Sequence, residues 1–395
     1  NPVVLDGSPI DALRAFVSSA RAEAPAGLPP MASGAFGYLG YDMIQYVEPV
    51  QITRPDVLGV PEALLIVPKV VVIFDHLYQE LLLVGRVEDD DDAINVLLDS
   101  IEEQLERLPS LPPKDREPSV VTLASDTSKD RYFEIVETCR DYIKAGDIFQ
   151  VVPSQRFSVP FARKPISFYR ALRRLNPSAF MFHMNLGEVS LVGSSPEILV
   201  RVRDGRVAIR PIAGTRPRSG DSEEDARRAQ DLLSDPKEMA EHLMLLDLGR
   251  NDVGRVAAYG SVTVTESFVV ERYSHVMHIV SHVEGDLREG LDAVDALLAG
   301  FPAGTVSGAP KIRAMQIIDE VETSRRGIYG GAVGYFGWNG DLDTCIALRT
   351  AVIKDGQLHI QAGGGVVLDS VAQYEYDETV HKSGALRRAA ELSAS

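Results

Sequence analysis

Tight-turn dipeptides between strand-like segments constrain the fold of this chain most strongly. Asp204-Gly205, Asn339-Gly340 and Asp355-Gly356 each separate two runs rich in apolar and β-branched residues, such as ILVRVR and RVAIR around the first. A two-residue hairpin turn of this kind needs positive φ at both central positions, which Asn, Asp and Gly tolerate. Strands joined by such hairpins are antiparallel, so the sequence predicts an α+β fold rather than a doubly wound parallel sheet.

A polar, Pro-rich segment, LPSLPPKDREPS at residues 108–119, marks a shift in composition along the chain. The length of 395 residues leaves room for more than one domain. We therefore predict an N-terminal region at residues 1–118 and a second domain at residues 119–395, which holds the motifs discussed below. Because the chain begins at Asn1 rather than Met, we expect that an N-terminal stretch precedes it.

The formal net charge of -17 argues against binding to nucleic acid or to anionic membranes, which require a basic surface. An acidic enzyme that takes an anionic substrate must concentrate positive charge locally or obtain it from a metal ion. No apolar run approaches the roughly 20 residues that cross a bilayer. Cys139 and Cys345 lie in helix-like and strand-like segments, so we expect inert core thiols in a reducing cytoplasm.

The segment SDPKEMAEHLMLLDLGR has the features of a helix that begins at a strong cap. Asp235 can accept hydrogen bonds from the first turn, Pro236 suits the first helical position, and Glu238 can complete a capping box. Met239 and Leu243 then supply apolar contacts on the helix. This helix is therefore expected to form whether or not the protein has a function that depends on it.

Two predicted helices each carry two glutamates at the spacing ExxE. Glu238 and Glu241 lie on one side of the first helix, and Glu375 and Glu378 repeat the spacing in QYEYDETVHKSGALRRAAE, with Lys382 one turn further on. Four carboxylates from two helices suit a hard cation such as Mg²⁺ that keeps several waters and bridges to an anionic substrate. A single ExxE pair more often belongs to a solvated helix face, so spacing alone only suggests a metal site.

Three histidines gather in ERYSHVMHIVSHVEG, namely His275, His278 and His282. Their spacing could place a metal on a helix, but the alternation of apolar and polar residues also predicts a strand. On a strand His278 and His282 share a face and His275 points away, which disfavours a zinc triad. A single histidine that gives, takes or polarises a proton fits better, because its ordinary pKa lies near neutrality.

Glycine-rich segments flank the two ExxE helices, at residues 211–216, 301–311 and 363–365. None matches the phosphate-binding pattern GxxxxGK[ST] or a GxGxxG that follows a strand, so a nucleotide site is poorly supported. The bare backbone at residues 363–365 could approach a carboxylate and donate N–H groups to it. When these glycines are taken alone, ordinary turn chemistry is the better explanation of them.

Several long motifs, in a fixed order, resemble those of the chorismate-utilising enzymes, and within them most closely the anthranilate synthases. They are PIAGTRPR, EHLMLLDLGRND, RYSHVMHIVSHV, FPAGTVSGAPK, CIALRTAV and GGGVVLDSVAQYEYDET, and the similarity extends from about residue 128 to the C-terminus and more weakly through GYLGYD. The resemblance implies a four-layer α+β fold, with outer helices around two facing antiparallel sheets. Chorismate and Mg²⁺ would bind between these sheets.

The same resemblance assigns roles to particular residues. It implies that Glu241 and Glu378 bind Mg²⁺ directly and that Glu238 and Glu375 act through water. For the substrate it implies the binding residues Tyr329, Arg349, Lys382, Gly214, Gly364 and Gly365, and for catalysis Glu197, His278 and Thr215. Of these, Tyr329 and Arg349 would hold the enolpyruvyl carboxylate, and an Arg side chain suits a carboxylate because it can donate two hydrogen bonds.

The implied reaction adds ammonia at C2 of chorismate with loss of the C4 hydroxyl, and then eliminates pyruvate to form anthranilate. In the resemblance Glu197 corresponds to the general acid and His278 to the histidine required for elimination. Water-using relatives have a lysine where this chain has Gln150, and aminodeoxychorismate synthases have one where it has Ala213, so both positions favour direct attack by ammonia.

The source of ammonia must be a separate protein, because neither cysteine lies in a GxCxG nucleophile motif. The resemblance therefore implies a glutamine amidotransferase subunit as partner. Two alternatives remain open at this point. One is an enzyme that stops at 2-amino-2-deoxyisochorismate before pyruvate is eliminated, and the other is a non-catalytic regulatory paralogue.

Overall fold

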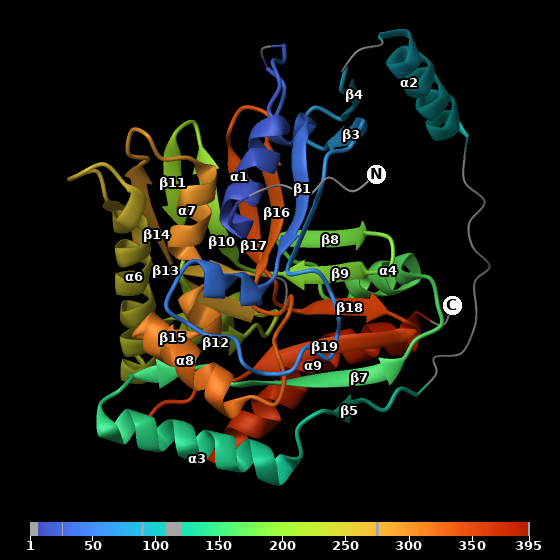
Figure 1. The fold of residues 1–395 in the computed structure, drawn as a ribbon. Helices are drawn as coiled ribbons and strands as arrows, with labels where there is room; N and C mark the ends of the chain where they lie inside the picture. The colour runs from blue at the N-terminus through green and yellow to red at the C-terminus, as the bar shows by residue number, and fades with distance from the viewer. Residues whose placement is uncertain (1–6, 26, 88–90, 108–119, 274–275, 394–395) are drawn as a thin grey trace.

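A computed structural model describes residues 7–25, 27–87, 91–107, 120–273 and 276–393 (Figure 1). Two antiparallel sheets form its centre, and helices cover their outer faces. Strands of the two sheets run roughly crosswise in the view of Figure 1. The predicted α+β class with a four-layer arrangement is therefore confirmed.

The first sheet, called the large sheet here, contains strands from most of the chain. Its described strands follow the order β12 (Ile212–Pro217), β14 (Val276–Asp286), β11 (Arg206–Ile209), β10 (Ile198–Arg203), β17 (Leu342–Ile346), β16 (Ala332–Gly337), β1 (Gly34–Leu39) and β2 (Ala63–Ile66), and β13 (Thr263–Arg272) also pairs with β14. The predicted strand in RYSHVMHIVSHVEG is thus confirmed as β14, while His275 lies outside the described residues.

The second sheet, called the small sheet here, has the strand order β5 (Ala124–Ser125), β7 (Ser154–Pro160), β19 (Gln357–Gly363), β18 (Thr350–Lys354), β9 (Ser190–Ser195) and β8 (Phe180–Asn185). Two short ribbons complete the strands, β6 (Gln150–Val151) with β15 (Gly308–Ala309), and β3 (Val70–Asp75) with β4 (Glu80–Gly85). The β6–β15 ribbon matters most for function, because it holds Gln150 beside the segment at residues 301–311.

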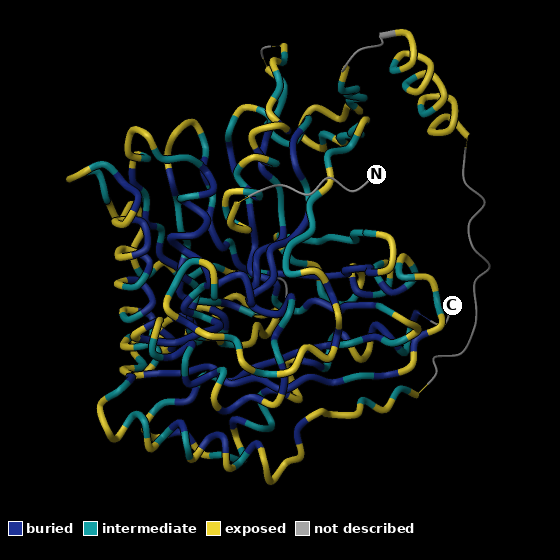
Figure 2. The backbone as a smooth tube through the Cα atoms, in the orientation of Figure 1, coloured by how far each residue is buried: buried dark blue, intermediate teal, exposed yellow. Residues whose placement is uncertain are grey.

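Buried apolar side chains join the two sheets face to face. Tyr38, Val333 and Cys345 of the large sheet form one cluster with Leu191 and Val352 of the small sheet. Figure 2 shows this central region as the most deeply buried part of the backbone. The apolar area removed from water between the sheets is the main stabilising contribution of this layer.

Helices pack on the outside of both sheets. α5 (Ser222–Ser234), α6 (Pro236–Val256) and α7 (Ala293–Gly300) contact the large sheet, while α4 (Pro165–Leu175) and α9 (Ala372–Leu392) contact the small one. The others are α1 (Pro9–Ser19), α2 (Asp91–Glu106), α3 (Lys129–Ala145) and α8 (Lys311–Val321), with 3₁₀ turns at Pro30–Ala32, Tyr41–Tyr46 and Gly304–Val306. No helix within these described residues is both long and apolar enough to span a membrane.

The predicted hairpins are present, with one difference in detail. Asp204-Gly205 and Asp355-Gly356 have positive φ at both positions, from 50° to 75°, as their turn type requires. At Asn339-Gly340 only Gly340 has positive φ, so the expectation of two such residues is wrong there. The Asn339 side chain instead accepts a hydrogen bond from the Asp341 amide at 3.1 Å, which closes the turn in another way.

The cap predicted for α6 is also confirmed in part. Asp235 accepts hydrogen bonds from the amides of Lys237 at 3.0 Å and Glu238 at 3.4 Å, and Pro236 is the first helical residue. The prediction of a capping box is wrong, because the Glu238 carboxylate pairs with Arg216 at 2.9 Å instead of accepting a hydrogen bond from the backbone amide of Asp235. A guanidinium is a stronger partner for a carboxylate than a backbone amide.

Both cysteines are buried and unpaired, as expected. Cys139 lies in α3 and Cys345 in β17, and burial raises the pKa of each thiol to about 12. The proposed domain boundary lies at residues 108–119, outside the described residues, and it stays a prediction. β1 and β2, which precede it, are hydrogen-bonded into the large sheet beside β16, so that sheet contains strands from both sides of the boundary.

Candidate active site

A cavity of about 430 Å³ lies where α6 and α9 meet the ends of the central strands. Twelve of the thirteen residues that the sequence assigns to the site line it, namely Glu197, Gly214, Thr215, Glu238, Glu241, His278, Tyr329, Arg349, Gly365, Glu375, Glu378 and Lys382. The residues come from positions between 197 and 382 in the chain. The fold therefore gathers into one cavity side chains that are far apart in sequence.

Twelve of the thirteen assigned residues thus line the cavity, and Gly364 lies directly behind its wall. A Cβ atom added to Gly364 would stand 3.1 Å from Oε2 of Glu375 and 3.3 Å from Oε2 of Glu378. At Gly365 an added Cβ would lie 2.6 Å from Nε2 of Gln150. A side chain at Gly364 or Gly365 would therefore displace these cavity groups, and at Gly363 an added Cβ would lie only 2.8 Å from the backbone carbonyl oxygen of Pro153.

The two ExxE pairs meet across this cavity. Burial raises the pKa of Glu241, and the charges of Glu238 and then Glu378 raise it further. Burial likewise raises the pKa of Glu375. The negative charge of Glu378 and a hydrogen bond between the two side chains raise this pKa further. Carboxylates of α6 and α9 thus repel one another, and a positive charge placed between them would relieve that repulsion.

Basic side chains already partner two of these carboxylates. Arg216 donates to Glu238 at 2.9 Å, and its other nitrogens reach Asp231 at 2.7 Å and Asp235 at 2.9 Å. Lys382 lies 2.8 Å from Oε1 of Glu378 and donates to the carbonyl of Gly363 at 3.0 Å. The acidic cluster is therefore partly neutralised by the chain itself.

The donor set fits Mg²⁺ in its chemistry, because all four candidate side chains offer carboxylate oxygens and Mg²⁺ is usually held by one or two carboxylates plus water. Within the described parts of the chain, no three His, Cys, Asp or Glu side chains are gathered closely enough to form a complete metal cage. The arrangement therefore suits a cation that keeps several waters better than one, such as structural Zn²⁺, that is enclosed by protein ligands.

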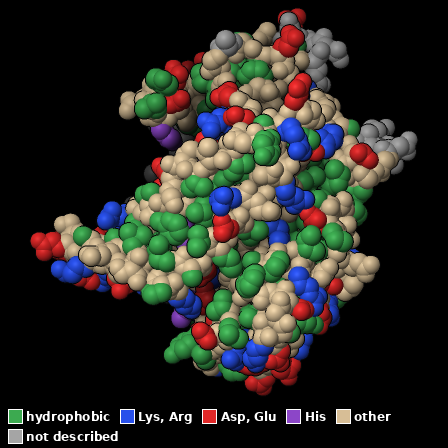
Figure 3. All heavy atoms as spheres, turned by 90° about the vertical axis from the view of Figure 1, so that its left-hand side faces the viewer, with side chains coloured by type: hydrophobic (Ala, Val, Ile, Leu, Met, Phe, Trp, Pro, Cys, Tyr) green, Lys and Arg blue, Asp and Glu red, His purple; other side chains and the backbone are tan. Residues whose placement is uncertain are grey.

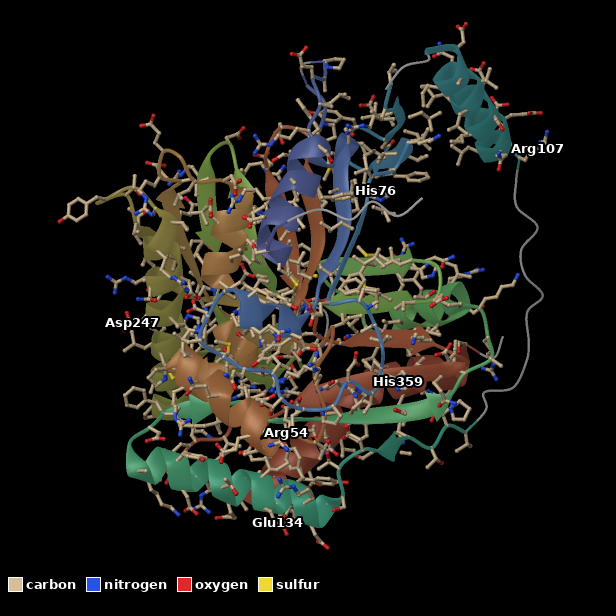
Figure 4. All side chains as sticks on the ribbon, in the orientation of Figure 1. Arg54, His76, Arg107, Glu134, Asp247 and His359 are labelled. Carbon is tan, nitrogen blue, oxygen red and sulfur yellow. The ribbon has the colours of Figure 1, made fainter. Side chains whose placement is uncertain are left out.

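The orientation of α6 explains why its two glutamates face inward. His242 is fully buried, and its Nε2 lies 2.7 Å from Oγ of Ser281 on β14, which anchors the helix to the large sheet. Asp247, on the opposite side of α6, points away from the rest of the molecule (Figure 4) and pairs with Arg250 at 2.9 Å. The helix thus has one face toward solvent and one toward the cavity.

Glu197 is a buried carboxyl group in the cavity wall, just before β10. It is 5% exposed, and Oε1 accepts a hydrogen bond from Oγ1 of Thr305 at 2.8 Å. Burial raises the pKa of Glu197 to about 8, although hydrogen bonds from Thr305 and the Ile212 amide and the charge of Arg349 oppose this rise. Glu197 is therefore protonated at neutral pH and can donate a proton.

The hydrogen bonds of His278 define which ring nitrogen faces the cavity. Nδ1 lies 2.8 Å from the carbonyl oxygen of Gly214 and 3.1 Å from Oγ1 of Thr215. Because a carbonyl oxygen only accepts, Nδ1 must carry the proton, which leaves a lone pair on Nε2 of the neutral ring. Burial lowers the pKa of His278, so the neutral ring predominates at neutral pH.

Arg349 and Tyr329 line the same cavity as the carboxylate pairs. Arg349 follows β17 with φ of 47°, a left-handed conformation that is unusual for a long side chain and typical of functional sites. Burial raises the pKa of Tyr329 to about 12, so its hydroxyl stays protonated and can donate. A half-buried guanidinium with a phenol donor is suited to hold a carboxylate.

Thr305 and Lys237 also line the cavity, and sequence reasoning assigned no role to either. Thr305 belongs to the motif FPAGTVSGAPK, which could have pointed to it. Its hydrogen-bond partner Glu197 is 108 residues away in the sequence, so their pairing could not be predicted. The sequence did not indicate Lys237 as a cavity residue, because a lysine in the first turn of a helix is expected to point into solvent. Its charge instead lowers the pKa of Glu241 and of Glu375.

Comparisons with known proteins agree with this geometry. The family model of the chorismate binding enzymes matches residues 4–388, so the chain belongs to the chorismate binding enzyme family. It is 55% identical to anthranilate synthase component 1 of Cereibacter sphaeroides, over 98% of this chain and 79% of the relative. The corresponding protein of Pseudomonas aeruginosa is 54% identical over 93% of this chain and 77% of the relative.

Among solved structures, anthranilate synthase component I from Streptococcus pneumoniae superposes with a TM-score of 0.90 at 40% identity. The match covers 98% of this chain and 86% of that protein. The resemblance found in the motifs is thus confirmed, both for the family and for the group of relatives within it.

Proposed function

We propose that this chain converts chorismate and ammonia to anthranilate, pyruvate and water, with Mg²⁺ as cofactor. The observation that carries the proposal is one cavity that joins paired carboxylates to a protonated Glu197 and to a neutral His278 whose Nε2 is free to accept a proton. Relatives of this chain at 54% to 55% identity are named anthranilate synthase component 1, which supports the same reaction.

Positive groups would bind the dianionic substrate. Arg349 and Tyr329 would hold the enolpyruvyl carboxylate through hydrogen bonds, and Lys382, which also lines the cavity, would attract a carboxylate. When bound, Mg²⁺ would supply a positive charge for the ring carboxylate, with Glu241 and Glu378 as direct ligands and Glu238 and Glu375 acting through water. The Arg216–Glu238 ion pair favours this division, because it already engages Glu238.

In the first stage ammonia would form the C2–N bond while the ring double bonds shift and the C4–O bond breaks. Hydroxide is a poor leaving group, so the departing oxygen needs a proton as the bond breaks. Glu197 would donate that proton, because burial keeps its carboxyl protonated and Thr305 fixes its orientation. The product of this stage is the amino intermediate, water and an ionised Glu197.

In the second stage the C2 proton would be removed and the C3–O bond would break, which releases pyruvate and leaves the aromatic ring. Nε2 of His278 would accept the C2 proton, because Nδ1–H is held by the Gly214 carbonyl. Gly214 and Thr215 would border the ring side of the substrate, next to His278, and Gly364 and Gly365 would leave room for its carboxylate.

The nature of the nucleophile follows from Gln150 and Ala213, which both line the cavity. Oε1 of Gln150 is buried without a hydrogen-bond partner among the described residues. A neutral amide cannot deprotonate water, and alanine offers no amine nucleophile, so both residues favour ammonia itself.

A separate glutamine amidotransferase subunit would supply that ammonia. The relatives are named as first components, which implies a second one for those proteins. Figure 3 views the α6 side of the molecule and shows hydrophobic side chains exposed there among charged ones. Phe149, next to Gln150, is 71% exposed, and such a side chain near the cavity is suited to contact another subunit.

The proposal is tested with purified protein, chorismate, Mg²⁺ and excess ammonium at alkaline pH. Anthranilate is followed by its fluorescence and pyruvate by a coupled dehydrogenase. We expect both products in equal amounts. A folded protein that yields neither would refute the proposal, and chorismate loss without pyruvate would favour the alternative, an enzyme that stops at 2-amino-2-deoxyisochorismate.

The pH dependence of the rate of chorismate consumption should follow the ionisation of Glu197. If the concentration of free ammonia is held constant, chorismate consumption should be level up to about pH 8 and then fall as Glu197 loses its proton. The sign follows from the direction of the shift, since a general acid with a raised pKa is active below that pKa. Initial rates between pH 6.5 and about 10 at fixed free ammonia check this. A rate that keeps rising past pH 9 would contradict the role of Glu197.

Replacing His278 by Met should separate the two stages. Chorismate should still be consumed, because amination does not use His278, while the rate of anthranilate formation should fall to about 1% or less and the amino intermediate should accumulate. General base removal typically costs about 10²–10⁴-fold, which sets the size of the loss. Chromatography of the reaction mixture measures chorismate, the amino intermediate and anthranilate. His359→Met on β19 is a matched control, because His359 is hydrogen-bonded to Ser158 and does not line the cavity. Full conversion to anthranilate would remove His278 from the mechanism.

A further inference from the structure

A tyrosine packs against the ring of His278 and is itself held by an ion pair. Tyr273 follows β13, and its ring lies 5.6 Å from the His278 ring between centroids, at an interplanar angle of 61°. Glu271, the last but one residue of β13, is the register partner of His278 in β14. The two strands thus bring Tyr273 and Glu271 next to the same histidine.

The Tyr273 hydroxyl is anchored through Glu271. It donates a hydrogen bond to Oε2 of Glu271 at 2.8 Å, while Oε1 of Glu271 accepts from Nη2 of Arg210. The Glu271 side chain is 30% exposed and that of Arg210 is 25% exposed. Both carboxylate oxygens are engaged, and Arg210, which also lies 3.8 Å from Glu266, pairs with Glu271, so Glu271 serves as a fixed point rather than as a free base.

We propose that Arg210, Glu271 and Tyr273 form a clamp that positions the His278 ring for the elimination of pyruvate. This inference rests on the proposed function. None of the three residues lines the cavity, so they act through His278 and not by contact with substrate.

The geometry explains why His278 needs such a clamp. The contacts of Nδ1 with the Gly214 carbonyl and with Oγ1 of Thr215 hold one edge of the ring, while rotation about the Cα–Cβ and Cβ–Cγ bonds of His278 would move Nε2. The Tyr273 ring packs edge-on against the imidazole and would limit that movement, and its own hydroxyl is held by Glu271. Nε2 is then aimed at one place, and a misplacement of about 1 Å can lower the rate of a step about 10²-fold.

The clamp would serve only one of the two stages. Amination uses Glu197, which has its own partner in Thr305, whereas elimination uses His278. A loosened His278 should therefore lower pyruvate release more than chorismate consumption. The clamp would thus determine whether the enzyme completes the reaction or releases the amino intermediate.

The test compares Tyr273→Phe, Tyr273→Leu and Glu271→Gln with the unaltered chain under the assay conditions above. The ratio of pyruvate released to chorismate consumed should fall several-fold in Tyr273→Phe and Glu271→Gln, and about tenfold in Tyr273→Leu, which also lacks the ring. Tyr259→Phe is the control, because Tyr259 is fully exposed at a loop and should leave the ratio unchanged. Thermal unfolding checks that every variant is folded.

A second measurement separates positioning from a general structural defect. In ¹⁵N spectra of histidine-labelled protein, the His278 signals are identified by their loss in His278→Met. They should show a protonated Nδ1 in the unaltered chain and a mixture of tautomers or broadened signals in Tyr273→Leu. Equal losses of both half-reactions, or an unchanged product ratio with an unchanged His278 spectrum, would overturn the clamp. Absence of anthranilate from the unaltered chain would instead overturn the proposed function.

Discussion

Replacing Glu197 by Gln should lower chorismate consumption by about 10²–10⁴-fold, because the departing C4 oxygen then receives no proton from the enzyme. Gln has nearly the same shape, and its amide oxygen can still accept the hydrogen bond that Thr305 donates at 2.8 Å. An amide does not act as an acid at any accessible pH. The loss should therefore affect both products equally, unlike the effect expected for His278→Met.

Stability should not fall in Glu197→Gln, since the change removes a group whose ionised form is disfavoured by burial. For the same reason the free energy of unfolding of the unaltered chain should decrease as pH rises from about 4.5 toward 8, where the folded protein retains this proton longer than the unfolded chain. Glu284→Gln is a matched control, because Glu284 lies on β14 in an ion pair with Arg206 outside the cavity. Retention of more than a tenth of the activity in Glu197→Gln would contradict the assignment.

Local patterns predicted the parts of this fold whose causes are local. Asp204-Gly205 and Asp355-Gly356 form the expected turns because both residues of each pair accept positive φ without help from the rest of the chain. Asp235 caps α6 for the same reason. At Asn339 and Glu238 the local rule failed. The Asn339 side chain accepts a hydrogen bond from the backbone amide of Asp341, and the Glu238 carboxylate pairs with the Arg216 side chain instead of with the helix cap.

The order of the strands could not be obtained from such patterns. β1 pairs with β16 across nearly 300 residues of sequence, and nothing in either segment encodes that partner. The resemblance to a known family supplied the layers, while the spacing of residues supplied only the antiparallel connections. Long-range pairing depends on how all the apolar faces are buried together, which a single sequence does not display.

The site shows the same division. Spacing placed Glu238 with Glu241 and Glu375 with Glu378, but their convergence depends on how α6 and α9 pack. Thr305 and Tyr273 were not predicted because each contacts another side chain of the site rather than carrying the chemistry itself: Thr305, in a 3₁₀ turn, bonds Glu197, and Tyr273, just after β13, packs on His278. Residues that position a catalytic group leave no chemical pattern of their own in the sequence.

Replacing Glu378 by Gln should reduce turnover at limiting Mg²⁺ by at least about 100-fold, because it removes a proposed direct ligand, and loss of even an outer partner of a metal site typically costs 10–100-fold. Glu375→Gln, which would act through water, should have a smaller effect. The amide also leaves Lys382 without its ion pair at 2.8 Å, so part of the loss should persist at saturating Mg²⁺.

The measurement that separates metal binding from catalysis is a titration of Mn²⁺ by electron paramagnetic resonance, since Mn²⁺ prefers the same oxygen ligands as Mg²⁺. Mn²⁺ affinity should fall in the order unaltered chain, Glu375→Gln, Glu378→Gln. Glu391→Gln lies on the same helix, paired with Arg388 at 2.7 Å away from the cavity, and should bind Mn²⁺ normally. Normal activity of Glu378→Gln at limiting Mg²⁺ would refute direct ligation by this residue. Two helices contribute the carboxylates, so the cation could also hold α6 and α9 together. Weaker Mn²⁺ binding in Glu378→Gln with an unchanged unfolding temperature would show that the cation acts in substrate binding and chemistry instead.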